Sequence, residues 1–427
     1  MTTTTDHIES VNAPLLDAQA EQFGFLSHQL ARRDLNADGI VARLRAFQVA
    51  IPSWALGAGG TRFGRFGYGG EPATLEQKLD DVALLNDLTR SASSVSLHIP
   101  WDIPDDPDAI RAYAAQRGIG FDAVNSNTFQ DQPGQQHSYK FGSLNHVDPA
   151  VRAQAVAHNQ DVIDYGVAVG STALTVWLAD GSSFPGQLNF RQAFRNTLDS
   201  LQQIYAHLPD DWQLYVEYKP YEPNFYSMTI PDWGTSLQLC RELGDRANVL
   251  VDLGHHLPNT NIEQVVGQLI GFGRLGGFHF NDSKYGDDDL TVGAIKPYQL
   301  FLIYTELVWG MNHNDAGNPP LAWMIDASHN LKDPLEDLLQ SLDNILTAYA
   351  KAMLVDYEAL ADAQAANDVT RCSELLRAAY ETDVRPLVRE SRLRAGGAIN
   401  PVATYRAMGA RERRIAERGT DSSASGL

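Results

Sequence analysis

Short apolar runs alternate with amphipathic segments through most of the chain, from about residue 47 to about residue 330. The apolar runs have the branched and aromatic content of buried strands, whereas the segments between them carry apolar side chains at helical spacing. The predicted strands are 47–54, 95–102, 121–129, 173–180, 213–220, 249–256, 276–283 and 321–330. The predicted helices between them are 74–89, 108–116, 149–169, 189–207, 233–243, 262–272 and 297–308.

This alternation indicates a parallel sheet, because a helix is the usual connection between parallel strands. Eight strands without an obvious break predict a closed (β/α)8 TIM barrel over residues 46–333. A doubly wound open sheet is the alternative. It is disfavoured because no GxGxxG motif that opens directly into a helix follows the first strand.

Helical patterns flank the predicted barrel on both sides. Residues 1–45 form an N-terminal helical segment, in which a helix is expected over 13–46 and the first eleven residues are polar and frayed. Residues 334–418 form a helical extension that docks on the barrel or mediates oligomerisation, and 419–427 form a disordered tail. Between the first strand and helix, seven glycines and three aromatic residues fill 55–72. An ordinary flexible loop is one interpretation, but its length favours a loop that covers a substrate.

Composition narrows the class of protein. In 427 residues, 44% are hydrophobic and 20% are charged, as in soluble globular proteins. The net charge of −20 argues against nucleic acid and anionic membranes as partners, since both would repel the protein. Two cysteines make no disulfide framework, and neither a leader nor a membrane-length apolar run is apparent. A cytoplasmic protein is therefore expected.

Polar side chains gather at the carboxyl ends of the predicted strands, which meet at one face of a barrel. The densest clusters are VDLGHH (251–256), GFHFNDS (277–283) and GDDD (286–289). Buried carboxylates and imidazoles are costly unless positive charge lies among them, and a divalent metal centre is the simplest compensation. The residues at these ends are His98, Asn125, Asn127, Trp177, Asp180, Glu217, Lys219, Asp252, His255, His279, Asp326 and Ser328.

Two ligand sets are predicted from these clusters. The first set is rich in oxygen and suits Mn²⁺ or Mg²⁺ better than structural zinc; it comprises Glu217, Asp252, His279 and Asp326. A second ion would be held by His255, Asp287 and Asp289. Two neighbouring metals can bind two adjacent oxygens of one substrate and polarise both. Lys219, two residues beyond Glu217 on the same side of a strand, is predicted to stabilise a developing oxyanion.

Each of these residues also has an ordinary structural interpretation. A lysine or aspartate at a strand end is usually solvated, and Asp252 could cap a helix. GDDD could be an acidic surface turn, and His98 and His255 could be structural histidines. The concentration of such residues at one face nevertheless favours a site. His256 and Asp288 are interpreted as bystanders.

Long continuous motifs in the chain resemble those of the broad-substrate bacterial L-rhamnose isomerases. They include IPSW followed by GGTRF, SLHIPWD, HSYKFGSL, VEYKPYEP, VDLGHHLPNTNIE, GGFHFNDSKYGDDDL, MIDASHN and NPVATYRAMG. The resemblance implies a xylose-isomerase-like barrel, two Mn²⁺ ions per subunit (with Co²⁺ or Mg²⁺ as alternatives) and a homotetramer. It implies a metal-dependent aldose–ketose isomerase acting on L-rhamnose and L-rhamnulose, and on D-allose and D-allulose. The chief departure lies before the last strand, in WGMNHNDAGNPPLAW (309–323).

The resemblance also implies roles for individual residues. The first ligand set would hold a structural metal and the second a catalytic metal. Lys219, Asp326, His255 and Ser328 would act at the reacting end of the sugar. The substrate-binding residues would be Trp54, His98, Phe129 and Trp177, with Phe63 reaching the site of a neighbouring subunit. Hydrogen would move between C2 and C1 as hydride or as a proton through an enediol.

Two other functions compete with this interpretation. A metal-dependent hydrolase or nuclease on a related barrel is the first, but cleavage of a phosphodiester would require basic residues along the groove. A non-catalytic sugar-binding or scaffold protein is the second, and it would not need two full ligand sets.

Overall fold

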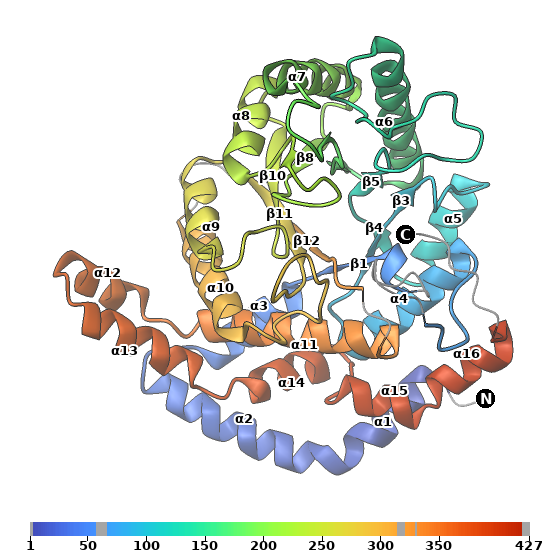
Figure 1. Ribbon diagram of the computed structural model, residues 1–427. Coiled ribbons are helices and arrows are strands. Elements are labelled where there is room, and N and C mark those ends of the chain that lie inside the picture. Colours follow the sequence, from blue (N-terminus) through green and yellow to red (C-terminus); the bar gives the residue numbers. More distant parts are fainter. Residues whose placement is uncertain (1–2, 57–65, 314–320, 329–330, 421–427) are drawn as a thin grey trace.

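The structure is a computed structural model that describes residues 3–56, 66–313, 321–328 and 331–420. Parallel strands form its centre (Figure 1). They are β1 (Ala50–Pro52), β2 (Ser94–Ser96) with β3 (His98–Ile99), β4 (Gly120–Phe121) with β5 (Val124–Ser126), β6 (Ala173–Val176), β8 (Gln213–Glu217), β10 (Ala247–Asp252), β11 (Leu275–Phe280) and β12 (Ala322–Ile325).

The sheet closes on itself. β2 and β3 together form one interrupted barrel strand, and β4 and β5 form the next, because β2 pairs with β4 and β3 pairs with β5. The last strand, β12, pairs in parallel with β1 through Met324 and Ala50. The predicted (β/α)8 TIM barrel is therefore confirmed, and the open-sheet alternative is wrong.

A ring of helices surrounds the barrel (Figure 1). Capping side chains fix several helix starts: Asp148, Asn189 and Asp232 accept hydrogen bonds from backbone N–H groups of the first turn. Residues 334–352, predicted as the start of the extension, form a helix that packs against α10 and α4 and so occupies the eighth position of the ring. The ring helices are α4 (Leu75–Thr89), α5 (Pro107–Ala115), α6 (Pro149–Val169), α7 (Phe190–His207), α8 (Trp233–Leu243), α9 (Ile262–Gly271), α10 (Pro297–Asn312) and α11 (Pro334–Ala352).

Most strands end earlier than their apolar patterns predicted. The run predicted as strand 47–54 contains the short β1 followed by a 3-10 helix, η2 (Ser53–Ala55), and the strand predicted over 173–180 ends at Val176. Trp54, Trp177 and Asp180 therefore lie beyond their strands, whereas Glu217, Asp252 and His279 lie within theirs. The loop after β6 contains β7 (Gly181–Ser182), which pairs antiparallel with β9 (Ser227–Met228) in an unpredicted two-stranded sheet.

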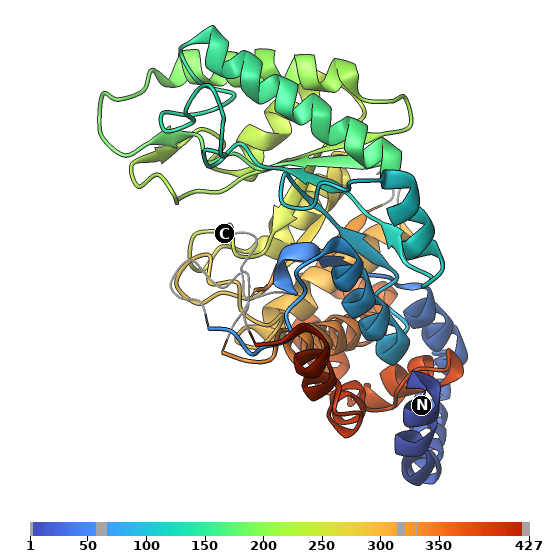
Figure 2. The same cartoon turned by 90° about the vertical axis from the view of Figure 1, so that its right-hand side faces the viewer.

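The two ends of the chain meet in a layer of helices against one side of the barrel (Figures 1 and 2). In the extension, α14 packs on α2 and α3, and α15 packs on α1. The N-terminal elements are α1 (Thr4–Asn12), η1 (Ala13–Leu15), α2 (Leu16–Ala31) and α3 (Ala37–Ala46). The extension continues after α11 with α12 (Tyr357–Ala365), α13 (Val369–Tyr380), α14 (Arg385–Arg394), α15 (Pro401–Ala407) and α16 (Ala410–Arg418).

Two predictions for the N-terminal segment are wrong. Residues 3–12 are not frayed, because Thr3 and Asp6 form a capping box at the start of α1 and Asn12 hydrogen-bonds to the backbone of Gly397 and Ile399. The single helix expected over 13–46 is divided, and Asn36 caps the start of α3. No helix in the described part of the chain combines the length and apolar character needed to cross a membrane.

The interior of the barrel is filled at its amino end. Ala123, Ala173, Tyr215 and Leu250 form a small buried cluster there with Ala322 packed against it, and Ala173 and Ala322 are the first residues of their strands. The main core lies between the strands and the helix ring. This arrangement leaves space inside the barrel only toward the carboxyl ends of the strands, which is the face where the polar residues gather.

Candidate active site

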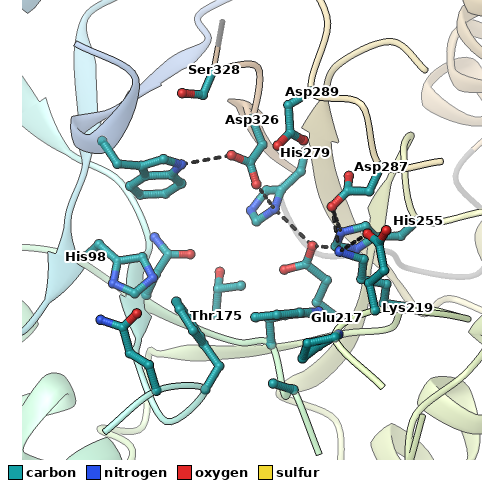
Figure 3. Close-up of a pocket in the computed structure, with 18 of the residues that line it drawn as sticks. His98, Thr175, Glu217, Lys219, His255, His279, Asp287, Asp289, Asp326 and Ser328 are labelled. Atoms are coloured by element: carbon teal, nitrogen blue, oxygen red, sulfur yellow. Dashed lines mark hydrogen bonds and ion pairs between the residues drawn. The ribbon is translucent and has the colours of Figure 1, made fainter. Parts of the chain in front are cut away.

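A cavity of about 500 Å³ opens at the carboxyl end of the barrel. Each of the eight barrel strands, or the loop that follows it, contributes a lining side chain. Carboxylates lie on one side with His255 and His279, and His98 lies on the opposite side (Figure 3). The lining includes Trp54, His98, Trp101, Asn125, Phe129, Thr175, Trp177, Glu217, Lys219, Glu222, Phe225, His255, His279, Asp287, Asp289, Asp326 and Ser328.

Two groups of potential metal ligands converge on the acidic side. In the first group, one ligand atom is offered by each of Glu217, Asp252 and His279, and these three atoms lie within 4.8 Å of one another. The second group has the same spacing and consists of Asp252, His255 and Asp287. Asp252 therefore belongs to both groups, whereas the sequence interpretation placed it in one. Asp326 borders the first group, with its Oδ2 3.5 Å from Nδ1 of His279.

Strand register explains why residues so far apart in the sequence meet. Asp252 ends β10 directly beside His279 on β11, and Glu217 ends β8 beside Leu250. Asp252 is held by hydrogen bonds that its Oδ1 accepts from the Gly254 backbone (2.7 Å) and the Asn281 side chain (2.9 Å). Two imidazole nitrogens converge on one oxygen of Glu217: His255 Nδ1 at 3.1 Å and His279 Nδ1 at 3.3 Å.

The carboxyl groups on this side of the cavity differ strongly in pKa, although they lie close together. Burial, with the carboxylates of Asp287 and Glu217, raises the pKa of Asp252 to about 7 against the opposite effect of His255. Burial and neighbouring carboxylates likewise raise the pKa of Asp289. For Glu217, the effect of burial is outweighed by His279 and His255, which lower its pKa to about 2.

Lys219 is the one lysine or arginine among the described residues that line the cavity. Its Nζ lies 2.6 Å from Oδ2 of Asp287, 3.7 Å from Oε2 of Glu222 and 5.4 Å from the centre of the Trp177 ring. Although Asp287 is buried, His255 and Lys219 hold its pKa well below the usual range. Among the described residues, six carboxyl groups thus face one lysine and two imidazoles. The carboxylate oxygens and imidazole nitrogens match the ligand preferences of Mn²⁺ and similar divalent ions, so these residues fit a divalent metal site.

Aromatic rings form the opposite side of the cavity. His98 stacks on Trp101 at 4.1 Å between ring centres and meets Trp54 and Phe129 edge-on at 5.3 and 5.6 Å. Phe129 in turn contacts Trp177 at 5.0 Å. Burial lowers the pKa of His98 to about 3, so this imidazole is neutral near pH 7. The Trp54 indole N–H donates a 2.9 Å hydrogen bond to Asp326 Oδ1, which joins the aromatic wall to the acidic side.

The structure brings nearly all residues singled out in the sequence to this cavity. Asp252 lies just behind the lining, within the metal-ligand groups, and Phe63 lies outside the described residues. His256 and Asp288 contact other groups: His256 hydrogen-bonds to the Tyr218 hydroxyl, and Asp288 accepts from backbone N–H groups of its own turn.

Besides Asp252, two strand-end residues are not in the lining. Asp180 is buried in a turn, where it accepts hydrogen bonds from the backbone N–H groups of Ser143 and Asn145. Asn127 is buried, and its backbone N–H donates to His158.

Several lining residues were not assigned a role from the sequence. Thr175 could have been found, because it is two residues from Trp177 and so faces the same way along a strand. Asn125 was noticed only as a strand-end residue. Trp101 and Phe225 lie in turns whose direction no sequence pattern reveals.

Comparisons with known proteins agree with this geometry. The family model described as a xylose isomerase-like TIM barrel matches residues 87–320. A protein of Rhizobium meliloti named probable sugar isomerase is 51% identical over 97% of this chain and 96% of its own length. A protein of the same description from Mesorhizobium japonicum is 51% identical over 98% and 97%. A xylose isomerase of Thermus thermophilus is 24% identical over 52% of this chain and 60% of its own.

Among solved structures, an L-ribulose 3-epimerase superposes with a TM-score of 0.51 at 15% identity, covering 73% of this chain and 98% of its own. At that identity, the likeness concerns the fold alone. The family match covers most of the barrel, and the two long relatives cover nearly the whole chain, so they show more than the fold. The chain therefore belongs to the xylose isomerase-like TIM-barrel family.

Proposed function

We propose that this protein is a divalent-metal-dependent aldose–ketose isomerase that interconverts L-rhamnose and L-rhamnulose, and also D-allose and D-allulose. The observation that carries the proposal is one cavity in which carboxylates and imidazoles face a wall of aromatic rings. Its volume of about 500 Å³ is in the range of small-molecule sites. The two long relatives named as sugar isomerases support the reaction class, and the motif resemblance supports the choice of sugars.

The proposal includes two divalent ions per subunit, preferably Mn²⁺, with Co²⁺ or Mg²⁺ as substitutes. One ion would be held by Glu217, Asp252, His279 and Asp326, and the other by His255, Asp287 and Asp289. Such ions supply Lewis-acid polarisation of the two sugar oxygens at the reacting end. Asp252, which belongs to both ligand groups, would bring the two sites together.

The side chains of the chain itself would orient the sugar and move the proton. Conversion of an aldose to a ketose takes one hydrogen from C2 to C1 and one proton from the C2 hydroxyl to the C1 oxygen. We propose that Asp326, whose pKa is raised by burial, carries this proton between the two oxygens. Lys219 would stabilise the negative charge that develops on the sugar oxygen. We place His255 and Ser328 at the same end of the sugar.

The far end of the sugar would contact Trp54, His98, Phe129 and Trp177. Their rings exclude water, which favours hydride transfer over proton transfer through an enediol. A neutral His98 could donate or accept a hydrogen bond with a sugar hydroxyl. We further propose a cytoplasmic homotetramer assembled by the helical extension, in which Phe63 reaches a neighbouring site.

The test removes metal with a chelator, restores Mn²⁺ and follows the conversion of L-rhamnose and of D-allulose. Turnover should be lost on chelation and return with Mn²⁺. The Asp289→Asn variant should keep its fold and lose at least about 10³-fold in turnover, a loss of the size seen when a charge-stabilising group is removed. Asp288→Asn is the matched control, because Asp288 accepts backbone hydrogen bonds in its own turn and should tolerate an amide.

The outcomes separate the competing functions. Full activity of Asp289→Asn would show that Asp289 has no role in the active site. Failure of the metal-loaded wild-type protein to convert either sugar would refute the isomerase, and cleavage of a phosphodiester by the same preparation would favour the hydrolase. Sugar binding without turnover would favour the scaffold.

A further inference from the structure

The last described helix, α16, buries three arginines along one face. Arg411, Arg414 and Arg418 are three and four residues apart, so they project from the same side of the helix. Their side chains are only 11%, 12% and 7% exposed. Arginine is rarely buried without partners, and each of these three meets a carboxylate of the barrel.

Arg411 binds the segment that follows the last barrel strand, β12. Arg411 makes a two-pronged contact with Asp333, including a 2.8 Å bond from Nε to Oδ2. Asp333 caps α11 and also accepts a 2.8 Å hydrogen bond from the Tyr405 hydroxyl. Arg411 additionally donates to the carbonyl oxygen of Gly69, at 3.1 Å, and so reaches the loop that follows the first strand.

The other two arginines hold α4 and the same loop. Arg418 binds both oxygens of Asp81 at 2.9 and 3.0 Å and the carbonyl oxygen of Gly70 at 3.1 Å, while Arg414 also contacts Asp81. The backbone of Gly70 donates to Gly419 at 2.8 Å. A side chain at Gly70 would lie 2.7 Å from the backbone of Arg414, so this loop abuts α16 directly.

A second buried ion pair connects α4 to the aromatic wall of the cavity. Lys78, one turn before Asp81, lies 2.5 Å from Oδ1 of Asp102, and both side chains are buried. The other oxygen of Asp102 accepts hydrogen bonds from the His98 backbone N–H, at 2.8 Å, and from the Ser53 hydroxyl. Ser53 immediately precedes Trp54. The backbones that carry Trp54 and His98 are therefore fixed by Asp102.

Buried ion pairs thus connect the C-terminal helix to α4, and α4 to the segment that carries His98. Buried ion pairs resist small displacements, because each partner would be left uncompensated. We propose that α16 is a positioning element for the cavity. Its arginines fix α4 and the loops after the first and last barrel strands, and through Lys78 and Asp102 they fix Trp54 and His98. The kinetic part of this inference rests on the proposed isomerase function.

The test shortens the chain so that it ends at Gly409, which removes α16 and leaves Asp81 and Asp333 open to water. Arg418→Met is the milder variant and keeps Arg414 beside Asp81. Hydrogen exchange should rise about tenfold in residues 50–56 and 94–102 and stay unchanged in β10 and β11, because only the former depend on α16. The KM for the sugar should rise about tenfold while kcat changes less than about threefold, as for lost substrate positioning.

Arg377→Met is the matched control, because Arg377 forms an exposed ion pair with Glu381 in the same extension. The inference is overturned if both α16 variants exchange like this control, or if exchange rises equally in β10 and β11, which would mean general loosening. It is also overturned if KM is unchanged in active variants. If the wild-type protein converts no sugar, the proposed function fails, and the exchange pattern alone decides whether α16 positions the wall.

Discussion

At the scale of single residues, neighbouring side chains give equally buried carboxyl groups different pKa values. Glu217 and Asp252 are both buried carboxyl groups a few ångströms apart. The pKa of Glu217 falls to about 2 because two imidazoles adjoin it, whereas burial and neighbouring carboxylates raise the pKa of Asp252 to about 7. Sequence identifies both as acids, but their charge states depend on which side chains the barrel brings beside them.

His98 leads to a prediction about the pH dependence of stability. Burial holds its folded pKa at about 3, whereas the unfolded chain has the ordinary value of 6.5. Its stabilising contribution is therefore complete above pH 6.5 and is lost as the pH falls toward 3, because only the unfolded state takes up the proton. From pH 7 to pH 5 this group alone accounts for roughly 2 kcal/mol of lost unfolding free energy, by proton linkage.

Replacement of His98 by asparagine should remove roughly that 2 kcal/mol from the pH dependence of stability. Urea unfolding of metal-saturated protein at pH 7 and pH 5 measures it. The exposed His28 provides the control, and His28→Asn should retain the wild-type difference between the two pH values. An equal difference in His98→Asn and in the wild type would contradict the prediction.

At the scale of elements, the sequence predicts helices more accurately than strand ends. The predicted helices 149–169 and 233–243 coincide with α6 and α8, because proline, aspartate and glycine mark their limits. Strand ends were placed too late, because the apolar pattern continues into loops whose residues line the cavity. β6 illustrates this: Trp177 follows its last residue.

At two helical glycines, replacement by alanine should change the unfolding free energy in opposite directions. A side chain at Gly166 of α6 would lie 2.5 Å from the Trp212 ring and 2.9 Å from Val124, so this glycine lets the helix approach the sheet. Gly166→Ala should therefore cost about 1–3 kcal/mol of unfolding free energy through overpacking. Gly24 of α2 has open space around it, and Gly24→Ala should add about 0.5–1 kcal/mol through helix propensity.

Urea unfolding of both variants beside the wild type measures the two effects. Gly24→Ala serves as the matched control, since it makes the same chemical change in another helix. Stabilisation by Gly166→Ala would show that the helix and sheet can separate without cost.

At the scale of the whole molecule, the chain is held together where its distant parts meet. β12 closes on β1, α1 packs on α15, and α16 bridges the loops that follow the first and last barrel strands. The cavity is formed at this closure as well as by the other strands, since Trp54 and Asp326 are hydrogen-bonded across it. Loss of packing at the chain ends should therefore alter the positions of residues that line the cavity.

Metal removal provides a prediction at this scale. The cavity concentrates six carboxyl groups in a protein of net charge −20, so a divalent cation should bind the folded state far more tightly than the unfolded chain. Mn²⁺ at 100 times its dissociation constant should add about 2.7 kcal/mol. The melting temperature of chelated protein should accordingly rise by a few degrees on addition of Mn²⁺.

Thermal melts with and without Mn²⁺ measure this effect, and sodium chloride at equal ionic strength controls for simple screening. Identical melting temperatures in Mn²⁺ and in sodium chloride would contradict a metal site in this cavity.

The barrel and most candidate site residues were predictable from the sequence, because strand and helix periodicity and the residue types at strand ends are local properties. Only the tertiary structure decided which of these residues contact one another. It placed Asp252 in both ligand groups, joined Trp54 to Asp326, and brought the arginines of α16 to Asp81 and Asp333. These contacts link positions up to hundreds of residues apart, and they follow from strand register and helix packing, which no local pattern along the chain determines.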